Sequence, residues 1–128
     1  MKLLIDTHAF LWLMGEPEKL SRRALEACKD RGNELYLSVV CAWEMAIKLQ
    51  LGKLRLGLPL STIIGQQQER NALQILSVKL EHVLALQNLP AHHADPFDRL
   101  LIAQAQVEEA HVVTSDPLFA KYSVKLWW

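Results

Sequence analysis

The stretch PFDRLLIAQAQVEEAHVVTSDP, residues 96–117, contains a helix, a strand and an acidic strand end in immediate succession. Apolar side chains recur along residues 96–109 at the spacing of an amphipathic helix, and Pro96 suits a first helical position. Residues 111–114 then form a β-rich run that stops just before Asp116. A helix followed at once by a short buried strand is half of a β–α–β unit, so this stretch predicts a parallel α/β sheet.

The same alternation extends through the rest of the chain. Short apolar runs predict further strands at residues 3–5, 35–40, 73–78 and 124–127. Helical spacing between glycine and proline stops predicts helices at residues 8–14, 21–30, 42–51, 60–71 and 79–86, and a helical turn at 117–121. The alternation predicts one α/β domain, residues 1–128, built as an α/β/α sandwich around a central parallel sheet.

The composition of the chain fits a folded domain and argues against one class of protein. Hydrophobic residues make up 51% of the 128 residues and charged residues 22%, which favours a packed core over disorder. Fourteen Lys and Arg balance fourteen Asp and Glu, so the net charge is zero. This balance argues against a protein that coats duplex DNA non-specifically, but a local metal site can still bind nucleic acid.

Cysteine usage and the N-terminus indicate where the protein works. The two cysteines, Cys28 and Cys41, form no CxxC motif and lack histidines at zinc-finger spacing, so we expect reduced, mostly buried thiols. The chain opens directly into the run at 3–5, which Asp6 interrupts, so we expect no signal peptide. No stretch approaches the roughly 20 apolar residues of a membrane helix. We therefore expect a soluble cytoplasmic protein with no membrane partner.

Four acidic residues follow predicted strands or lie near the starts of predicted helices: Asp6, Glu44, Asp98 and Asp116. Open parallel sheets build their ligand sites where the carboxyl ends of the strands meet. Two carboxylates about 4 Å apart repel by roughly 4 kcal/mol at an effective dielectric near 20. Acids that converge there need a cation between them, so the pattern predicts a divalent metal site with oxygen ligands, and hence phosphate chemistry.

Each acid also has a structural explanation. Asp6 and Asp116 both precede helical segments and suit the N-cap position. Before the helix at 96, Asp95 suits the cap and Asp98 is a first-turn acid favoured by the helix dipole. We favour Asp95 as the cap and Asp98 as a ligand, although both can approach one metal. Glu44 stands in an apolar stretch near a helix start, and burying it requires a partner.

Not all four acids are expected to bind the metal directly, because Mg²⁺ takes only one or two direct carboxylates and keeps several waters. We expect Asp6 to be a direct ligand, with Asp98 or Asp116 completing the protein ligands. Glu44 is expected to hold a metal-bound water.

Neighbouring polar residues have two interpretations each. The hydroxyls of Thr7 and Ser115 either orient a carboxylate or a water, or only bond their local turns. Arg99 either meets a substrate phosphate bidentately or is a solvated helix residue. We expect His8 to be a packing residue, and the histidine pair at 92–93 to belong to the turn before the helix.

Two other classes of protein are compatible with clustered acids. A phospho-accepting, Mg²⁺-binding signalling module also gathers aspartates at strand ends, but it needs an acceptor Asp after a middle strand, where Lys79 follows the run at 73–78. The second alternative is a non-catalytic interaction module on the same fold. Labelling with a phosphoryl donor discriminates the first of these.

Four stretches occur in the order LLIDTHAFLW, LSVVCAWEMAIKLQLGKL, LPAHHADPFDRLLIAQA and VVTSDPLFAKY and cover nearly the whole chain. They resemble the PIN-domain family, and in particular its VapC-type toxins from bacterial toxin–antitoxin pairs. The resemblance implies a PIN-like α/β/α sandwich, with Mg²⁺ or Mn²⁺ at Asp6, Glu44, Asp98 and Asp116. In one departure, Cys41 stands three positions before Glu44, where a hydroxyl residue is expected.

The resemblance also implies an activity and partners. It implies an endoribonuclease toxin that hydrolyses RNA phosphodiester bonds, forms homodimers and is inhibited by a cognate antitoxin protein. Lys48, Lys53 and Arg55 would then steer RNA towards the acids, with a solvated basic face as the alternative. Apolar surface on the helix at 8–14, which we expect to be mostly core, could receive an antitoxin helix.

Overall fold

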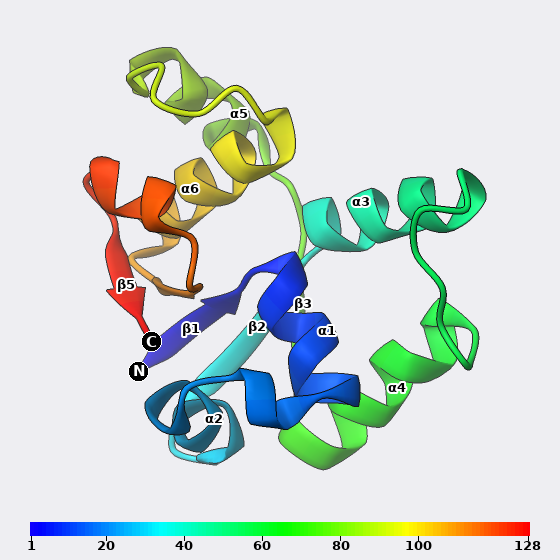
Figure 1. The fold of residues 1–128 in the computed structure, drawn as a ribbon. Helices are drawn as coiled ribbons and strands as arrows, with labels where there is room; N and C mark the ends of the chain where they lie inside the picture. Colours follow the sequence, from blue (N-terminus) through cyan, green and yellow to red (C-terminus); the bar gives the residue numbers. More distant parts are fainter.

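Five short strands form one parallel sheet at the centre of the molecule (Figure 1). The computed structural model describes residues 1–128. The strand order is β3-β2-β1-β4-β5, and every neighbouring pair is parallel. The strands are β1 Lys2–Ile5, β2 Glu34–Ser38, β3 Gln74–Leu76, β4 His111–Val113 and β5 Lys125–Trp127. The predicted parallel α/β sheet is confirmed.

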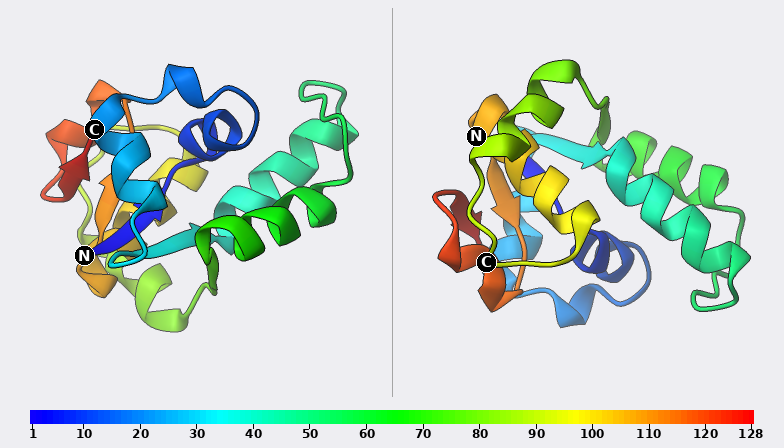
Figure 2. Two further views of the ribbon diagram at one scale, coloured as in Figure 1. Left: turned by 90° about the horizontal axis from the view of Figure 1, so that it is seen from below. Right: turned by 90° about the horizontal axis from the view of Figure 1, so that it is seen from above.

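Helices cover both faces of this sheet. The sheet lies between α1 and α2 on one face and α5 and α6 on the other, while α3 and α4 project to one side (Figures 1 and 2). The helices are α1 Thr7–Gly15, α2 Arg22–Lys29, α3 Val39–Gln50, α4 Leu60–Asn71, α5 Leu80–Ala85 and α6 Pro96–Glu108. Short 3₁₀ turns occupy Pro17–Lys19, Leu86–Asn88 and Pro117–Lys121. The predicted sandwich is thus confirmed.

The direction in which the chain adds strands reverses at β1. From β1 the chain adds β2 and β3 on one side, whereas β4 and β5 lie on the other. Such a switch point leaves a crevice at the carboxyl ends of the strands. Asp6 directly follows β1 and Asp116 lies just after β4, so the topology brings acids from opposite ends of the chain to the same crevice.

The core is built on β1, whose residues 3–5 are fully buried because helices cover both faces of the sheet. Phe10 of α1 is also fully buried, while Leu11 and Trp12 are half-buried against the core. The expectation that α1 is mostly core is therefore met at Phe10 and only partly at its neighbours. Both cysteines are free and buried, as predicted.

The predicted strand at 35–40 was wrong at its end, because β2 stops at Ser38. The Ser38 hydroxyl caps α3 by accepting a 3.0 Å hydrogen bond from the Val40 N–H. This cap outweighs the preference of Val39 and Val40 for strand conformation. As a result α3 begins before the predicted residue 42, and Glu44 lies in its second turn rather than at its start.

Ser38 also donates its hydroxyl hydrogen to Oε1 of Gln104 in α6, and both side chains are completely buried. Ser38→Ala removes the helix cap and leaves this acceptor without a donor, so we expect the free energy of unfolding to fall by about 2 kcal/mol. Denaturant unfolding followed by circular dichroism measures the change. Ser61→Ala, at an exposed position in α4, is the control, and equal midpoints for the two variants would contradict the role of Ser38.

Candidate active site

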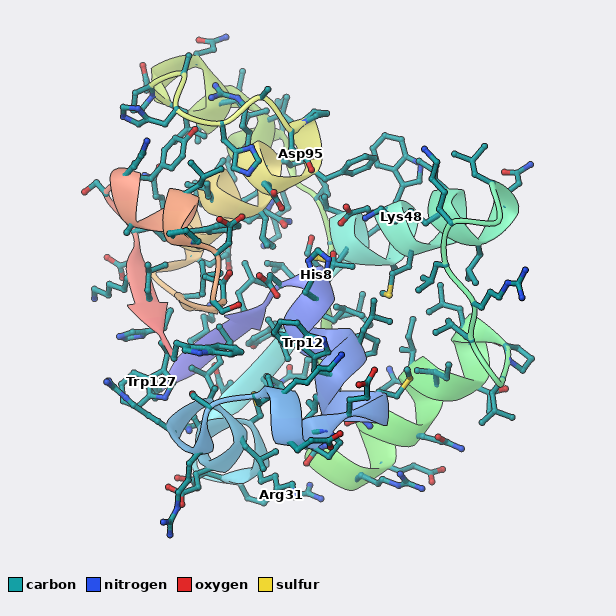
Figure 3. The ribbon with its side chains drawn as sticks, viewed as in Figure 1. His8, Trp12, Arg31, Lys48, Asp95 and Trp127 are labelled. Carbon is teal, nitrogen blue, oxygen red and sulfur yellow. The ribbon has the colours of Figure 1, made fainter.

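A pocket of about 100 Å³ opens where the carboxyl ends of β1 and β4 meet α3 and α6. All but one of its lining residues are polar or charged. They are Asp6, Thr7, His8, Glu44, Lys48, Asp95, Asp98, Asp116 and Phe119. Figure 3 labels His8, Lys48 and Asp95, which come from α1, α3 and the start of α6 and border the same region. The structure therefore gathers in one pocket the four acids that the sequence pattern singled out.

Asp6 is both the N-cap of α1 and part of the pocket wall. Its Oδ1 accepts a 2.7 Å hydrogen bond from the Ala9 backbone N–H, as the capping interpretation predicted. Burial raises the pKa of this carboxyl, and hydrogen bonds from Thr114 and Ala9 oppose the increase. Capping thus fixes the orientation of Asp6 without removing it from the pocket.

Asp116 has the same double role after β4. Its Oδ1 caps the following 3₁₀ turn by accepting a 2.9 Å hydrogen bond from the Leu118 N–H. The buried Thr114 hydroxyl accepts a 3.0 Å hydrogen bond from the Asp116 N–H and also bonds Asp6. Ser115 is exposed and does not line the pocket. The hydroxyl that orients the strand-end acids therefore comes from Thr114, which the sequence interpretation missed.

Glu44 has the partners that its burial requires. Its side chain comes from α3, and the residue is only 8% exposed. The Thr7 hydroxyl donates a 2.7 Å hydrogen bond to Oε1, and the Lys48 ammonium lies 3.1 Å from Oε2. Both carboxylate oxygens are therefore held by protein groups. Thr7 orients a carboxylate, which is one of the two interpretations that its sequence position allowed.

Asp95 and Asp98 divide their roles in the first turn of α6. Asp95 caps the helix by accepting a 2.9 Å hydrogen bond from the Phe97 N–H, as predicted, and it also lines the pocket. Burial, and to a lesser extent the negative charge of Asp95, raise the pKa of the Asp98 carboxyl to about 7. Asp98 therefore changes between its protonated and ionised forms near neutral pH.

His93 lies in the turn before α6, as predicted, but its contacts with the pocket acids were not anticipated. Its Nδ1 accepts a 3.1 Å hydrogen bond from the Asp95 N–H. The ring proton must therefore be on Nε2, which lies 3.0 Å from Oδ2 of Asp98 and 3.8 Å from Oδ2 of Asp116. His93 donates to Asp98 and holds it beside Asp116. The only feature of the sequence that pointed to this contact was the position of His93 in the short loop before Asp95.

Two other expectations are corrected by the geometry. The guanidinium of Arg99 donates to the backbone carbonyls of Pro90, at 2.9 Å, and Leu89, at 3.5 Å, and it does not line the pocket. Successive helical residues point about 100° apart, so Asp98 and Arg99 face different directions. His8 is not a packing residue, because it is exposed at the pocket with its ring centroid 6.2 Å from that of Trp12.

Cys41 replaces the expected hydroxyl and lies beneath the pocket. Its buried Sγ lies 3.9 Å from the carbonyl oxygen of Ile5, the last residue of β1. Burial raises the pKa of this thiol to about 12. Cys41 is therefore a neutral group that makes a weak contact with the β1 backbone, without adding another charge near Asp6.

The donor set suits a divalent cation that prefers oxygen. Burial raises the pKa of both Asp6 and Asp98, and neighbouring carboxylates add to the increase. One potential ligand atom each from His93, Asp98 and Asp116 lies within 4.8 Å of the others. The pocket lining offers carboxylate oxygens and no thiolate, a donor set that fits Mg²⁺ or Mn²⁺ better than thiophilic metals.

Comparisons with known proteins identify the family and the fold that this chain resembles. The family model described as PIN domain matches residues 3–125. The chain is 28% identical over 116 residues to Ribonuclease VapC22 of Mycobacterium tuberculosis, and the match covers 89% of this chain and 86% of that protein.

Two solved structures have a similar fold. One is VapBC2 from Rickettsia felis bound to a DNA fragment from their promoter, with a TM-score of 0.74 and 15% identity over 100% of both chains. The other is VapBC-1 from nontypeable Haemophilus influenzae, with a TM-score of 0.62 and 17% identity over 94% of this chain and 91% of that one. At these identities the likeness concerns the fold alone.

Proposed function

This chain belongs to the PIN-domain family, and from that premise we propose that it is a metal-dependent endoribonuclease and the toxin of a toxin–antitoxin pair. One observation carries the proposal: Asp6, Glu44, Asp98 and Asp116 come from four separate segments and line one small pocket. The relative named Ribonuclease VapC22 supports RNA as the substrate. The proposed nuclease domain comprises residues 1–128.

The pocket residues divide the chemical work. Asp6, Asp98 and Asp116 would hold Mg²⁺ or Mn²⁺. When bound, such an ion lowers the pKa of a coordinated water and neutralises charge on the scissile phosphate. Glu44, fixed by Thr7 and Lys48, would orient the attacking water through its remaining lone pairs. His93 would keep the Asp98 carboxylate in place by donating from Nε2.

The position of Lys48 explains how an acidic pocket can receive a polyanion. Its ammonium reaches Glu44 at the pocket wall and is part of the lining. A cation at this position attracts phosphate without requiring a net positive chain, whose formal charge is zero.

We also propose the partners and the location that go with this activity. A cognate antitoxin protein is supported by the fold shared with the two VapBC complexes, and the homodimer is proposed on the family resemblance alone. We propose a cytoplasmic location because a toxin of this kind would act on the RNA of its own cell. None of the helices combines the length and apolarity that a bilayer crossing requires.

Metal-dependent cleavage of RNA tests the function directly. The purified chain is incubated with 5′-labelled single-stranded RNA and Mg²⁺ or Mn²⁺, then with excess EDTA, and the products are mapped by sequencing their ends. We expect internal cleavage that EDTA stops and added Mn²⁺ restores. Cleavage that survives chelation, or that persists in Asp6→Asn, would contradict the proposal. RNA that binds without being cut would favour the non-catalytic interaction module.

A further inference from the structure

A second hollow, of about 240 Å³, adjoins the acidic pocket between α3 and the start of α6. Glu44, Lys48 and Asp95 line both cavities, so the two are adjacent. The other lining residues of the hollow are Ile47, Leu51, Lys53, Pro96 and Phe97. A nucleic-acid strand that lies across the acidic pocket therefore passes beside this hollow.

Phe97, which lines the hollow, forms an aromatic pair with Trp43, which lies outside the lining. The Phe97 ring meets the Trp43 ring edge-on, with centroids 4.9 Å apart. Trp43 is 57% exposed, although it lies in α3 one residue from the buried Glu44. Exposed aromatic rings beside a phosphate-processing site are the surfaces on which unpaired RNA bases stack.

Two lysines border the same hollow. Lys48 lies on its acidic side, where it contacts Glu44. Lys53 follows a tight turn that is held by hydrogen bonds from the Lys53 and Leu54 N–H groups to the Lys48 carbonyl, at 2.9 and 3.2 Å. This turn requires a positive φ of 71° at Gly52, which glycine adopts readily. Lys53 is therefore held at the hollow by a defined backbone conformation.

We infer that this hollow binds the nucleotide next to the cleaved bond, with its base on Trp43 and Phe97 and its phosphate between Lys48 and Lys53. The inference rests on the proposed ribonuclease function. Apolar lining residues together with two lysines match a base linked to phosphates, and the three lining residues shared with the acidic pocket match a single strand that runs from one to the other. A partner protein could also use an exposed tryptophan, and the experiment below separates the two.

The test is a cycle that combines a protein variant with a modified RNA. The RNA is a short single-stranded oligonucleotide of mapped cleavage site, made intact or with an abasic ribonucleotide at each position in turn. For the wild type, we expect an abasic residue beside the cleaved bond to lower kcat/KM by about 5- to 100-fold, the range of one base stack. Trp43→Ala should lower kcat/KM for intact RNA by a similar factor and add little when that base is missing.

Matched variants show whether a loss of activity is due to the aromatic ring of Trp43 and the charge of Lys53. Trp43→Phe should recover most of the activity, and Leu80→Ala, at another exposed apolar position, should behave as wild type. Lys53→Gln should raise KM several-fold, whereas Lys29→Gln on α2 should not. Mn²⁺ affinity, measured by electron paramagnetic resonance, should be unchanged in Trp43→Ala, because the metal residues are intact.

The possible failures are distinguishable. If the wild type cuts no RNA, the proposed function fails and the subsite fails with it. If the wild type cuts RNA, and Trp43→Ala cuts both the intact and the abasic RNA as fast as the wild type does, the subsite alone is overturned. Normal cleavage by Trp43→Ala together with lost binding of the antitoxin would assign the surface to a protein partner and would also overturn the inference.

Discussion

Asp98→Asn is expected to abolish RNA cleavage while making the metal-free protein more stable at pH 8. The first effect follows from removing one charge from the proposed metal ligands, which should lower kcat/KM by at least about 10³-fold because metal stabilisation of the transition state amounts to several kcal/mol. The second follows from the pKa of Asp98, which burial raises from 3.8 to about 7.

The direction of the stability effect is fixed by linkage. Folded Asp98 binds its proton more tightly than the unfolded chain does, so the free energy of unfolding falls as the pH rises from about 4 to about 7. One pKa unit corresponds to about 1.4 kcal/mol. The neutral Asn avoids this loss, so we expect a gain of up to about 4 kcal/mol at pH 8, reduced by solvent screening of the partly exposed carboxyl, that shrinks towards zero near pH 4.

Denaturant unfolding in EDTA at pH 4, 6 and 8 measures the stability, and the RNA assay measures the activity. Glu69→Gln, at an exposed position in α4, should change neither quantity and serves as the control. An Asp98→Asn protein that still cleaves at the wild-type rate would remove Asp98 from the active site. A variant that is less stable than wild type at pH 8 would show that ionised Asp98 is not destabilising.

Metal affinity is expected to rise with pH up to about 7 and then to level off. Protons and the metal compete for the same carboxylates, and Asp98 in the metal-free protein has a pKa of about 7. Below that pH, the affinity should change by up to about tenfold per pH unit for each proton displaced. Burial also raises the pKa of Asp6, which makes the dependence steeper at lower pH.

Mn²⁺ titrations at pH 5.5, 6.5, 7.5 and 8.5 measure this dependence, and the cleavage rate at subsaturating metal should follow it. Asp95→Asn is the informative variant, because the Asp95 charge contributes to the raised pKa of Asp98 and Asn is an equally good N-cap. It should move the break in the profile to lower pH. A flat profile, or a break that stays in place in Asp95→Asn, would contradict the electrostatic account of the pocket.

Elements bounded by strong local signals were predicted well from the sequence. The helix at 60–71 and the helical turn at 117–121 agree with the structure at both ends. Proline precedes or begins both of them, and its fixed φ and missing N–H act within a single turn of chain. The end of β2 was missed because the capping hydrogen bond of Ser38 competes with the strand preference of two valines.

Helical periodicity identified α3 but not the direction of its faces. Trp43 and Ala46 are apolar residues at helical spacing in α3, yet both are exposed. Because α3 projects from the sheet (Figure 1), only part of its surface meets the core, and Glu44 rather than Trp43 faces the pocket. Periodicity reports that neighbouring residues share a face, whereas the position of the helix decides what that face contacts.

The sequence by itself determined the parallel α/β fold and the four acids, because a buried strand, its polar end and the following helix cap are adjacent in the chain. The tertiary structure alone decided the surroundings of those acids. It placed Thr114 and His93 against Asp6 and Asp98, turned Arg99 away from the pocket and left Trp43 exposed beside it. The Thr114–Asp6 and Trp43–Phe97 contacts join segments far apart in sequence, and the His93–Asp98 and Arg99 contacts depend on how the loop before α6 folds back, so neither kind follows from local spacing.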